Sequence, residues 1–251
     1  MRLVGVTAVN FLLVATAASA GSLFIEGPLG AAADFAGTTI DRVAKTHSGG
    51  AWRALAATEP LPDDLLAHLR HGFSLAEIEH SRIDAERRWF VRNPEYLERV
   101  FTRAQRFLPY ITHELERRGL PLELALLPIV ESAYDPFAYS HGRAAGLWQM
   151  IPGTATRFGI RQNWWYDGRR DVVDSTRAAL DYLDYLYEFN DGDWLNAIAS
   201  YNSGEGNVRR AVKRNRAQGR PTDFFSLRLS RETSAYVPRL LALVEIVEDP
   251  R

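Results

Sequence analysis

The run LLPIVESAYDP at residues 126–136 is apolar up to one acidic residue, Glu131. Leu124, Leu127 and Glu131 are spaced three and four residues apart, which predicts that their side chains share one side of a helix. Burial and the partial negative charge of a helix C-terminus both raise the pKa of a carboxyl group, as a general acid at neutral pH requires. A glutamate at a helix end held by a neighbouring arginine has the same pattern, so both interpretations stay open.

Polar and aromatic residues adjoin one another further along the chain. In the pair Trp148–Gln149, the indole ring can lie against the C–H groups of a sugar, and the amide can donate and accept hydrogen bonds. Tyr201–Asn202 and Tyr236 are further candidates of the same kind. Taken alone, Trp148 is more typical of a hydrophobic core than of a sugar site.

The segments around these candidates have the periodicity of helices. Apolar positions recur at steps of one, three and four over 97–115, which predicts a long helix that ends at Gly119. Pro109 lies inside it and predicts a kink or a break. A following helix, with Pro121 in its first turn, is expected to carry Glu131 at its C-terminal end.

The second half of the chain is expected to be helical as well. Asp171 can cap the first of four further helices, which are expected over 172–187, 194–200, 208–217 and 236–247. Gly204 and Gly206 separate the two middle ones. Clear runs with a period of two, as in half-buried strands, are missing. The fold class expected is therefore mainly α.

Composition excludes several classes of site. The chain has 251 residues, 46% of them hydrophobic and 24% charged, which is enough for one sizeable core. Its formal net charge is −1, so no overall field favours nucleic acid or acidic lipid. Cysteine is absent, which excludes disulfides, thiolate catalysis and cysteine-based metal centres, and argues against a lipid anchor on a cysteine.

Residues 1–20 have the features of an export signal. Arg2 precedes a short apolar stretch, and Ala18–Ser19–Ala20 offers a cleavage site before Gly21. The stretch is short for a membrane span of about 20 residues, so we expect cleavage and a periplasmic protein without stable membrane insertion. An uncleaved tether in the inner membrane is the alternative. Beyond the signal we expect a loose linker over 21–60, a helical extension over 61–100 and one main domain over 101–251.

Four segments resemble the motifs of lytic murein transglycosylases in order and spacing: ELALLPIVESAYDP, GLWQMIPGTATRFG, ASYNSGEGNV and ETSAYVPRLLAL. The likeness is greatest to the membrane-bound D type of these enzymes and runs from about Asn93 to Val247. Three departures are visible: Ser200 stands where the family has alanine, the lipid-anchor cysteine is missing, and no glycan-binding LysM repeats follow. The resemblance implies a lysozyme-like helical catalytic domain of the soluble-lytic-transglycosylase (SLT) superfamily over 101–251.

The resemblance also implies which residues form the site. Glu131 would be the single catalytic acid and base, and Tyr236 would hydrogen-bond near its carboxyl group. The bound glycan would be contacted by Ser132, Trp148, Gln149, Tyr201, Asn202 and Tyr236.

The implied reaction cleaves the β-1,4 bond between N-acetylmuramic acid and N-acetylglucosamine in peptidoglycan and leaves a 1,6-anhydro ring on the muramic acid. Peptidoglycan glycan strands are the expected partner, and no metal, nucleotide or redox cofactor is expected. The nearest alternative is a muramidase that uses water, helped by one of Asp135, Asp167, Asp171 or Glu205, among which the sequence does not choose. A non-catalytic peptidoglycan-binding protein is a further alternative, against which the presence of Glu131 argues.

Three other patterns are weaker. The segment 204–208 begins like a dinucleotide-binding loop, but Arg209 replaces the third glycine and no strand is expected before it. His68 and His71 have no obvious third ligand, which argues against a metal site. The basic run over 209–220 is typical of a solvated helix face, or of a surface that approaches acidic stem peptides of the cell wall.

Overall fold

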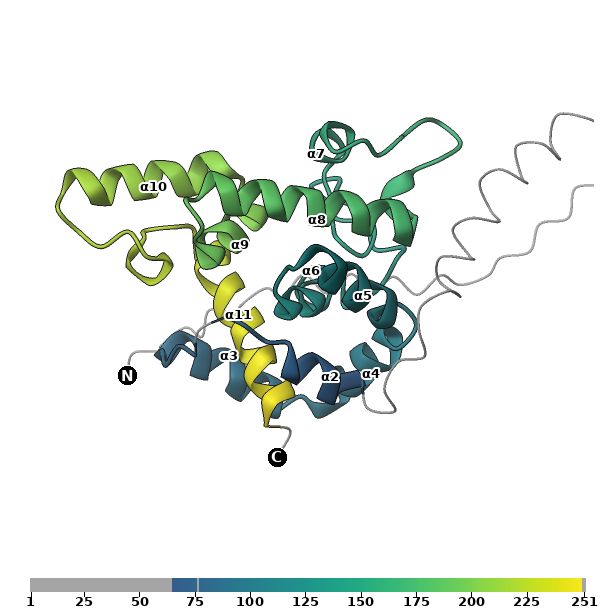
Figure 1. The fold of residues 1–251 in the computed structure, drawn as a ribbon, viewed down its shortest axis with the longest axis horizontal. Coiled ribbons are helices and arrows are strands. Elements are labelled where there is room, and N and C mark those ends of the chain that lie inside the picture. Colours follow the sequence, from purple (N-terminus) through teal and green to yellow (C-terminus); the bar gives the residue numbers. More distant parts are fainter. Residues whose placement is uncertain (1–64, 76, 250–251) are drawn as a thin grey trace, which may run out of the picture. The chain divides into compact units, whose positions relative to one another are not determined.

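Helices account for most of residues 65–75 and 77–249, the part of the chain that the computed structural model describes (Figure 1). In chain order they are α2 (Leu65–His71), α3 (Ser81–Val91), α4 (Pro94–Ala104), α5 (Leu108–Arg118), α6 (Leu127–Ser132), α7 (Pro152–Arg157), α8 (Val172–Phe189), α9 (Trp194–Ser203), α10 (Glu205–Ala217) and α11 (Arg231–Glu248). Short 3-10 helices are η1 (Leu122–Leu126), η2 (Gly168–Arg170) and η3 (Phe224–Ser226). Within the described ranges β pairing is limited to isolated bridges. The expected mainly α fold is confirmed.

The expected export signal and linker, over 1–20 and 21–60, lie outside the described residues. None of the described helices combines the length and the apolarity that crossing a membrane requires. The described residues belong to one compact unit, and α4 runs across residue 100, where we expected the extension to meet the main domain. In this unit α3 packs along α11, with Glu86 paired to Arg239 at 2.9 Å.

The helix expected over 97–115 is divided into α4 and α5, so the break predicted at Pro109 is confirmed. Pro109 lies in the first turn of α5, where a missing N–H breaks no helical hydrogen bond. Gly119 ends α5 in the left-handed conformation, with φ of 65°, as the sequence predicts.

The segment that carries Glu131 differs from the prediction. The single helix expected from Pro121 onward is two pieces, η1 and then the six-residue α6. Pro128 lies in the first turn of α6, where it could not continue a preceding α-helix because it has no N–H to donate and its ring would meet the carbonyl of Leu124. Glu131 nevertheless lies near the C-terminal end of its helix, as predicted.

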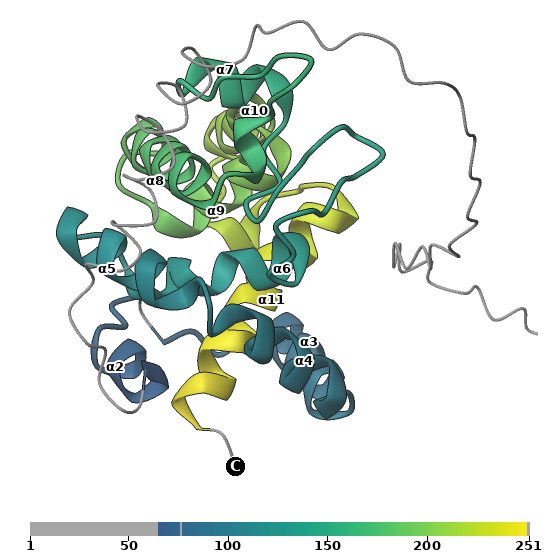
Figure 2. The same ribbon diagram turned by 90° about the vertical axis from the view of Figure 1, so that its right-hand side faces the viewer.

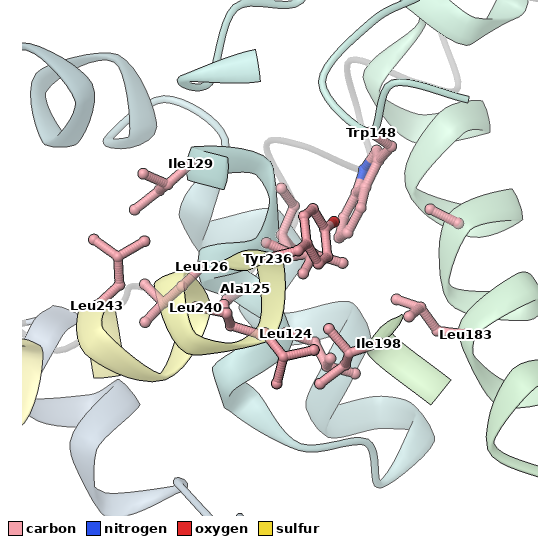
Figure 3. Close-up of a cluster of buried hydrophobic side chains, with 14 of the residues drawn as sticks. Leu124, Ala125, Leu126, Ile129, Trp148, Leu183, Ile198, Tyr236, Leu240 and Leu243 are labelled. Atoms are coloured by element: carbon pink, nitrogen blue, oxygen red, sulfur yellow. The ribbon is translucent and has the colours of Figure 1, made fainter. Parts of the chain in front are cut away.

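The η1–α6 segment lies in the middle of the described unit. Figures 1 and 2 both show α6 between a group formed by α8, α9 and α10 and a second group formed by α2, α3 and α4. η1 and α6 pack against α11, and every residue from Pro121 to Ile129 is buried. Figure 3 shows the resulting core, in which side chains of η1 and α6 lie among those of α11 and of Leu183 and Ile198.

A buried arginine holds the loop over 133–151 that follows α6. Nη1 of Arg169 donates to the carbonyl oxygens of Arg143 at 2.6 Å and Met150 at 3.1 Å, and its Nη2 pairs with Asp167 at 2.7 Å. Gly146 of this loop has φ of 81° and lies so close to Arg169 that an added Cβ would be 1.8 Å from the carbonyl oxygen. The backbone there has room for glycine alone.

We expect Gly146→Ala to lower the free energy of unfolding by roughly 2–4 kcal/mol, because the new Cβ meets backbone and the left-handed φ becomes strained. Gly153→Ala on α7 is the matched control, since no atom lies within 4 Å of an added Cβ there. Urea unfolding of both variants measures the difference. Equal stability of the two would contradict the close approach at Gly146.

Candidate active site

Glu131 faces a cavity of about 610 Å³ that six helices and the loop after α6 enclose. The lining residues come from α6, the loop over 140–151, α7, α8, α9, the start of α10 and α11. Among the residues expected from the sequence, the cavity brings together Glu131, Gln149, Tyr201, Asn202 and Tyr236. Residues more than 100 positions apart in the chain therefore share one site.

The carboxyl group of Glu131 is held in an environment that favours its proton. Its pKa is raised to about 8, chiefly by burial and to a smaller extent by the nearby negative charge of Glu232. The hydroxyl of Tyr236 donates a hydrogen bond to Oε1 of Glu131 and acts in the opposite direction. Desolvation outweighs this bond, so the group is mostly protonated at neutral pH and still reaches the cavity.

Two tyrosines beside Glu131 keep their hydroxyl protons and act as hydrogen-bond donors. Burial first, and then the charge of Glu131, raise the pKa of both Tyr236 and Tyr201 well above the ordinary value. The ring of Tyr236 packs in the core cluster (Figure 3) while its hydroxyl reaches Glu131. The hydroxyl of Tyr201 donates to the carbonyl oxygen of Trp148 at 2.8 Å, which joins α9 to the loop.

Gln149 and Asn202 line the cavity from two different parts of the chain, the loop after α6 and α9. Gln149 has a left-handed backbone, with φ of 44°, and its Nε2 donates to the carbonyl oxygen of Gly146 at 2.8 Å. Asn202 accepts from Oγ1 of Thr233 at 2.9 Å and donates to Glu232 at 3.4 Å. Both amides are oriented by the protein before any ligand arrives.

The side chains of Trp148 and Ser132 make hydrogen bonds within the protein. Trp148 is completely buried, its Nε1 donates to Oγ1 of Thr176 at 3.0 Å, and its side chain does not line the cavity. Ser132 is likewise absent from the lining, and its Oγ donates to the carbonyl oxygen of Leu147 at 2.8 Å. In the described structure both hold the loop against α6 and α8, and their contact with a glycan stays a prediction.

The cavity also contains residues that the sequence analysis missed. Glu232 and Arg239 line it together with Tyr236, and the three lie on one face of α11 at steps of four and three. That spacing could have revealed them. Tyr182 of α8 has no comparable signal, because its position depends on how α8 packs against α9.

Of the other acidic candidates, three hydrogen-bond within the protein away from the cavity, and one lines the cavity. Asp171 caps α8, Asp167 pairs with Arg169, and Asp135 accepts from the backbone N–H of Phe137 at 2.9 Å. Glu205 lines the cavity. Partial burial opposes its ionisation, but hydrogen bonds from its own backbone and from Arg157 and Tyr182 outweigh burial and keep its pKa below the ordinary value.

Histidines do not assemble a metal site in the described part of the chain. His68 pairs with Glu116, and Nδ1 of His71 lies 2.7 Å from the carbonyl oxygen of Ala67. No group of three histidine, aspartate or glutamate side chains in the described residues is arranged to hold a metal ion.

Stability should depend on pH through Glu131. Its pKa is higher in the folded protein than the ordinary 4.5, so the stabilisation by its proton is complete below pH 4.5 and is lost as the pH rises to about 8. We therefore expect Glu131→Gln to gain stability relative to the unsubstituted protein as the pH rises from 5 to 8. Urea unfolding at several pH values measures this trend. Glu98→Gln on the exposed side of α4 is the control, and a parallel trend in both variants would contradict the burial of Glu131.

Comparison with known proteins adds the family. The model of the family described as "Transglycosylase SLT domain" matches residues 109–224. Membrane-bound lytic murein transglycosylase D of Escherichia coli K12 is 46% identical over 195 residues, which are 77% of this chain and 43% of that protein. This chain thus spans less than half the length of that relative.

Two further proteins are similar to this chain. A protein of Alteromonas sp. (strain M-1) named for tributyltin chloride resistance is 43% identical over 149 residues, 59% of this chain and 72% of that protein. The X-ray structure of an inactive mutant of the lytic transglycosylase Slt from Pseudomonas aeruginosa aligns with a TM-score of 0.45 and 19% identity, over 83% of this chain and 47% of that one. The sequence relationships show that this chain belongs to the transglycosylase SLT-domain family.

Proposed function

We propose that the protein is a peptidoglycan lytic transglycosylase that cleaves the β-1,4 bond between N-acetylmuramic acid and N-acetylglucosamine and forms 1,6-anhydro-N-acetylmuramic acid ends. The observation that carries the proposal is a carboxyl group with a pKa of about 8, Glu131, facing a cavity in a chain of the SLT-domain family. A protonated carboxyl at neutral pH is what an acid catalyst of glycosidic cleavage needs.

In the first step Glu131 gives its proton to the glycosidic oxygen as the bond from that oxygen to C1 of the muramic acid breaks. Positive charge develops at C1, and the N-acetyl carbonyl of the same sugar can stabilise it, as in substrate-assisted glycosidases. Glu131 is then a carboxylate, and the hydrogen bond from Tyr236 stabilises this charged form.

In the second step the carboxylate of Glu131 takes the proton of the C6 hydroxyl while O6 forms a bond to C1. The ring closes, Glu131 regains its proton, and no water is consumed. The nucleophile belongs to the same sugar, so positioning replaces a second catalytic carboxylate. The amides of Gln149 and Asn202, already oriented by the protein, are suited to holding the sugar for this attack.

A muramidase that uses water is the second candidate, and one observation favours it. Glu205 and Glu232 line the same cavity, and the lowered pKa of Glu205 keeps it ionised. An ionised carboxylate could activate water at C1. Arg157 and Tyr182 already occupy the oxygens of Glu205, which makes it a poor base, so we prefer the transglycosylase.

We propose a periplasmic site of action. The export-signal features of residues 1–20 support it, and so does the location of the substrate, peptidoglycan.

The products distinguish the two candidates. Purified protein is incubated with peptidoglycan, and the released fragments are analysed by mass spectrometry before and after borohydride. We expect fragments lighter than their hydrolysed counterparts by one water and resistant to reduction. Reducible fragments that carry the extra water would establish the muramidase. Glu131→Gln is the matched variant, which should lose roughly 10²–10⁴-fold in rate while keeping its fold, because an amide cannot supply the proton.

Tyr236→Phe should separate a role in catalysis from a role in packing. Without the hydroxyl, the pKa of Glu131 rises further, so the fall of kcat/KM at alkaline pH should move upward, and the rate should drop because the carboxyl loses its orienting partner. The pH profile of kcat/KM measures both effects. Tyr110→Phe, buried on α5 and absent from the cavity lining, is the control. An unchanged pH profile with a lowered melting temperature would make Tyr236 a packing residue.

A further inference from the structure

A second cavity, of about 270 Å³, lies between α10, the loop after η3 and the first turn of α11. We call it the arginine pocket, because three arginines line it together with three hydroxyl side chains: Arg210, Arg214, Arg228, Ser203, Ser230 and Thr233. The loop between α10 and α11 turns back beneath α10, as Figure 1 shows, and so brings Arg228 to the same place as the two arginines of the helix.

The positive charges of this pocket are not neutralised by the described part of the protein. Arg210 donates to Oδ1 of Asn207, and Nη2 of Arg214 donates to the carbonyl oxygen of Arg228 at 3.0 Å, so both contacts are to neutral groups. The ion pairs among the described residues include none with these three arginines. Arg210 and Arg214 also repel each other, since residues four apart adjoin on a helix.

Three guanidinium groups around a hollow with hydroxyl donors make a site for an anion. Guanidinium binds carboxylate and phosphate through paired hydrogen bonds, and such charge-assisted bonds are stronger than neutral ones. An anion in the pocket would also relieve the repulsion between the arginines. Arg216 and Arg220 of the same basic run do not line the pocket, so the feature is a built site and not the whole solvated face.

The arginine pocket adjoins the cavity of Glu131. Ser203 lines both. The bond from Oγ1 of Thr233 to Asn202 joins a residue of the pocket to a residue of the Glu131 cavity at 2.9 Å. Glu232, which directly precedes Thr233 in the chain, lines the Glu131 cavity and not the pocket.

We infer that the arginine pocket binds a carboxylate of the peptide stem carried by the glycan strand, and so favours substrates with intact stems. The inference rests on the proposed function. A muramic acid held beside Glu131 carries its stem on the same sugar, and an extended peptide spans about 3.3–3.6 Å per residue, so the stem can extend from the Glu131 cavity into the neighbouring pocket. A free phosphate shares the chemistry but gives no reason for the pocket to adjoin the glycan cavity.

The test compares two substrates and two variants of the whole chain. Peptidoglycan strands with intact stems are compared with the same strands after an amidase has removed the stems. In Arg210→Gln/Arg228→Gln two of the three charges are gone, while Arg214 keeps its bond to the loop. Arg216→Gln is the matched control, exposed on the same helix and outside both cavities.

We expect the double variant to lose roughly tenfold in kcat/KM on strands with stems, mainly through KM, and to cleave stem-free strands like the unsubstituted protein. Arg216→Gln should behave like the unsubstituted protein on both. Equal loss on both substrates, or no loss on either, would overturn the inference. A protein that cleaves neither substrate before any substitution would instead refute the proposed function. Where thermal unfolding shows that the double variant is misfolded, Arg228→Gln alone, in the loop, carries the same test.

Competition identifies the source of the anion. A free stem peptide should inhibit cleavage of strands with stems, its carboxyl-amidated form should not, and the double variant should be insensitive to both. Inhibition by inorganic phosphate that depends on Arg210 and Arg228, with none by the stem peptide, would make the pocket a simple phosphate site and overturn the assignment to the stem.

Discussion

An ionised carboxylate beside an apolar wall loses hydration that one neighbouring hydroxyl only partly replaces. The arrangement around Glu131 depends on this imbalance. Six residues of α6 could not hold a buried carboxyl in place by themselves, since isolated helices shorter than about 12 residues are marginal in water. Their position comes from burial of the whole η1–α6 segment against α11, and the same packing brings Tyr236 to the carboxyl. The raised pKa of Glu131 and its position therefore both come from this packing.

Several polar side chains of the motifs donate hydrogen bonds to backbone carbonyl groups. The hydroxyl of Tyr134 donates to the carbonyl oxygen of Ala125 at 2.6 Å within the core, and the hydroxyls of Ser132 and Tyr201 donate to carbonyl oxygens of the loop. The loop over 133–151 has little regular structure, so its buried carbonyl groups need such donors. A polar or aromatic residue close to Glu131 in the sequence therefore does not have to contact a ligand.

The sequence predicts best what is decided locally. The end of α5 at Gly119, the break near Pro109 and the cap of α8 by Asp171 depend on the residues at those positions alone, and all three are as expected. Pro128 predicts the division between η1 and α6, but the apolar run around it has the pattern of one continuous helix. The buried indole N–H of Trp148 has its hydrogen-bond partner, Thr176, 28 residues further along the chain. The arginine pocket depends on how the loop over 218–230 folds back. Long-range packing of this kind leaves no periodic signal.

The hydrogen bond between Tyr236 and Glu131 joins residues 105 positions apart. Translation delivers the chain from its N-terminus at about 5–20 residues per second, so Glu131 leaves the ribosome several seconds before its partner. During that interval η1 and α6 have no α11 to bury them, and the carboxyl stays hydrated with an ordinary acidity. The acid of this site is therefore assembled late, as a product of completed folding, and a partly made chain carries the motif without its chemistry.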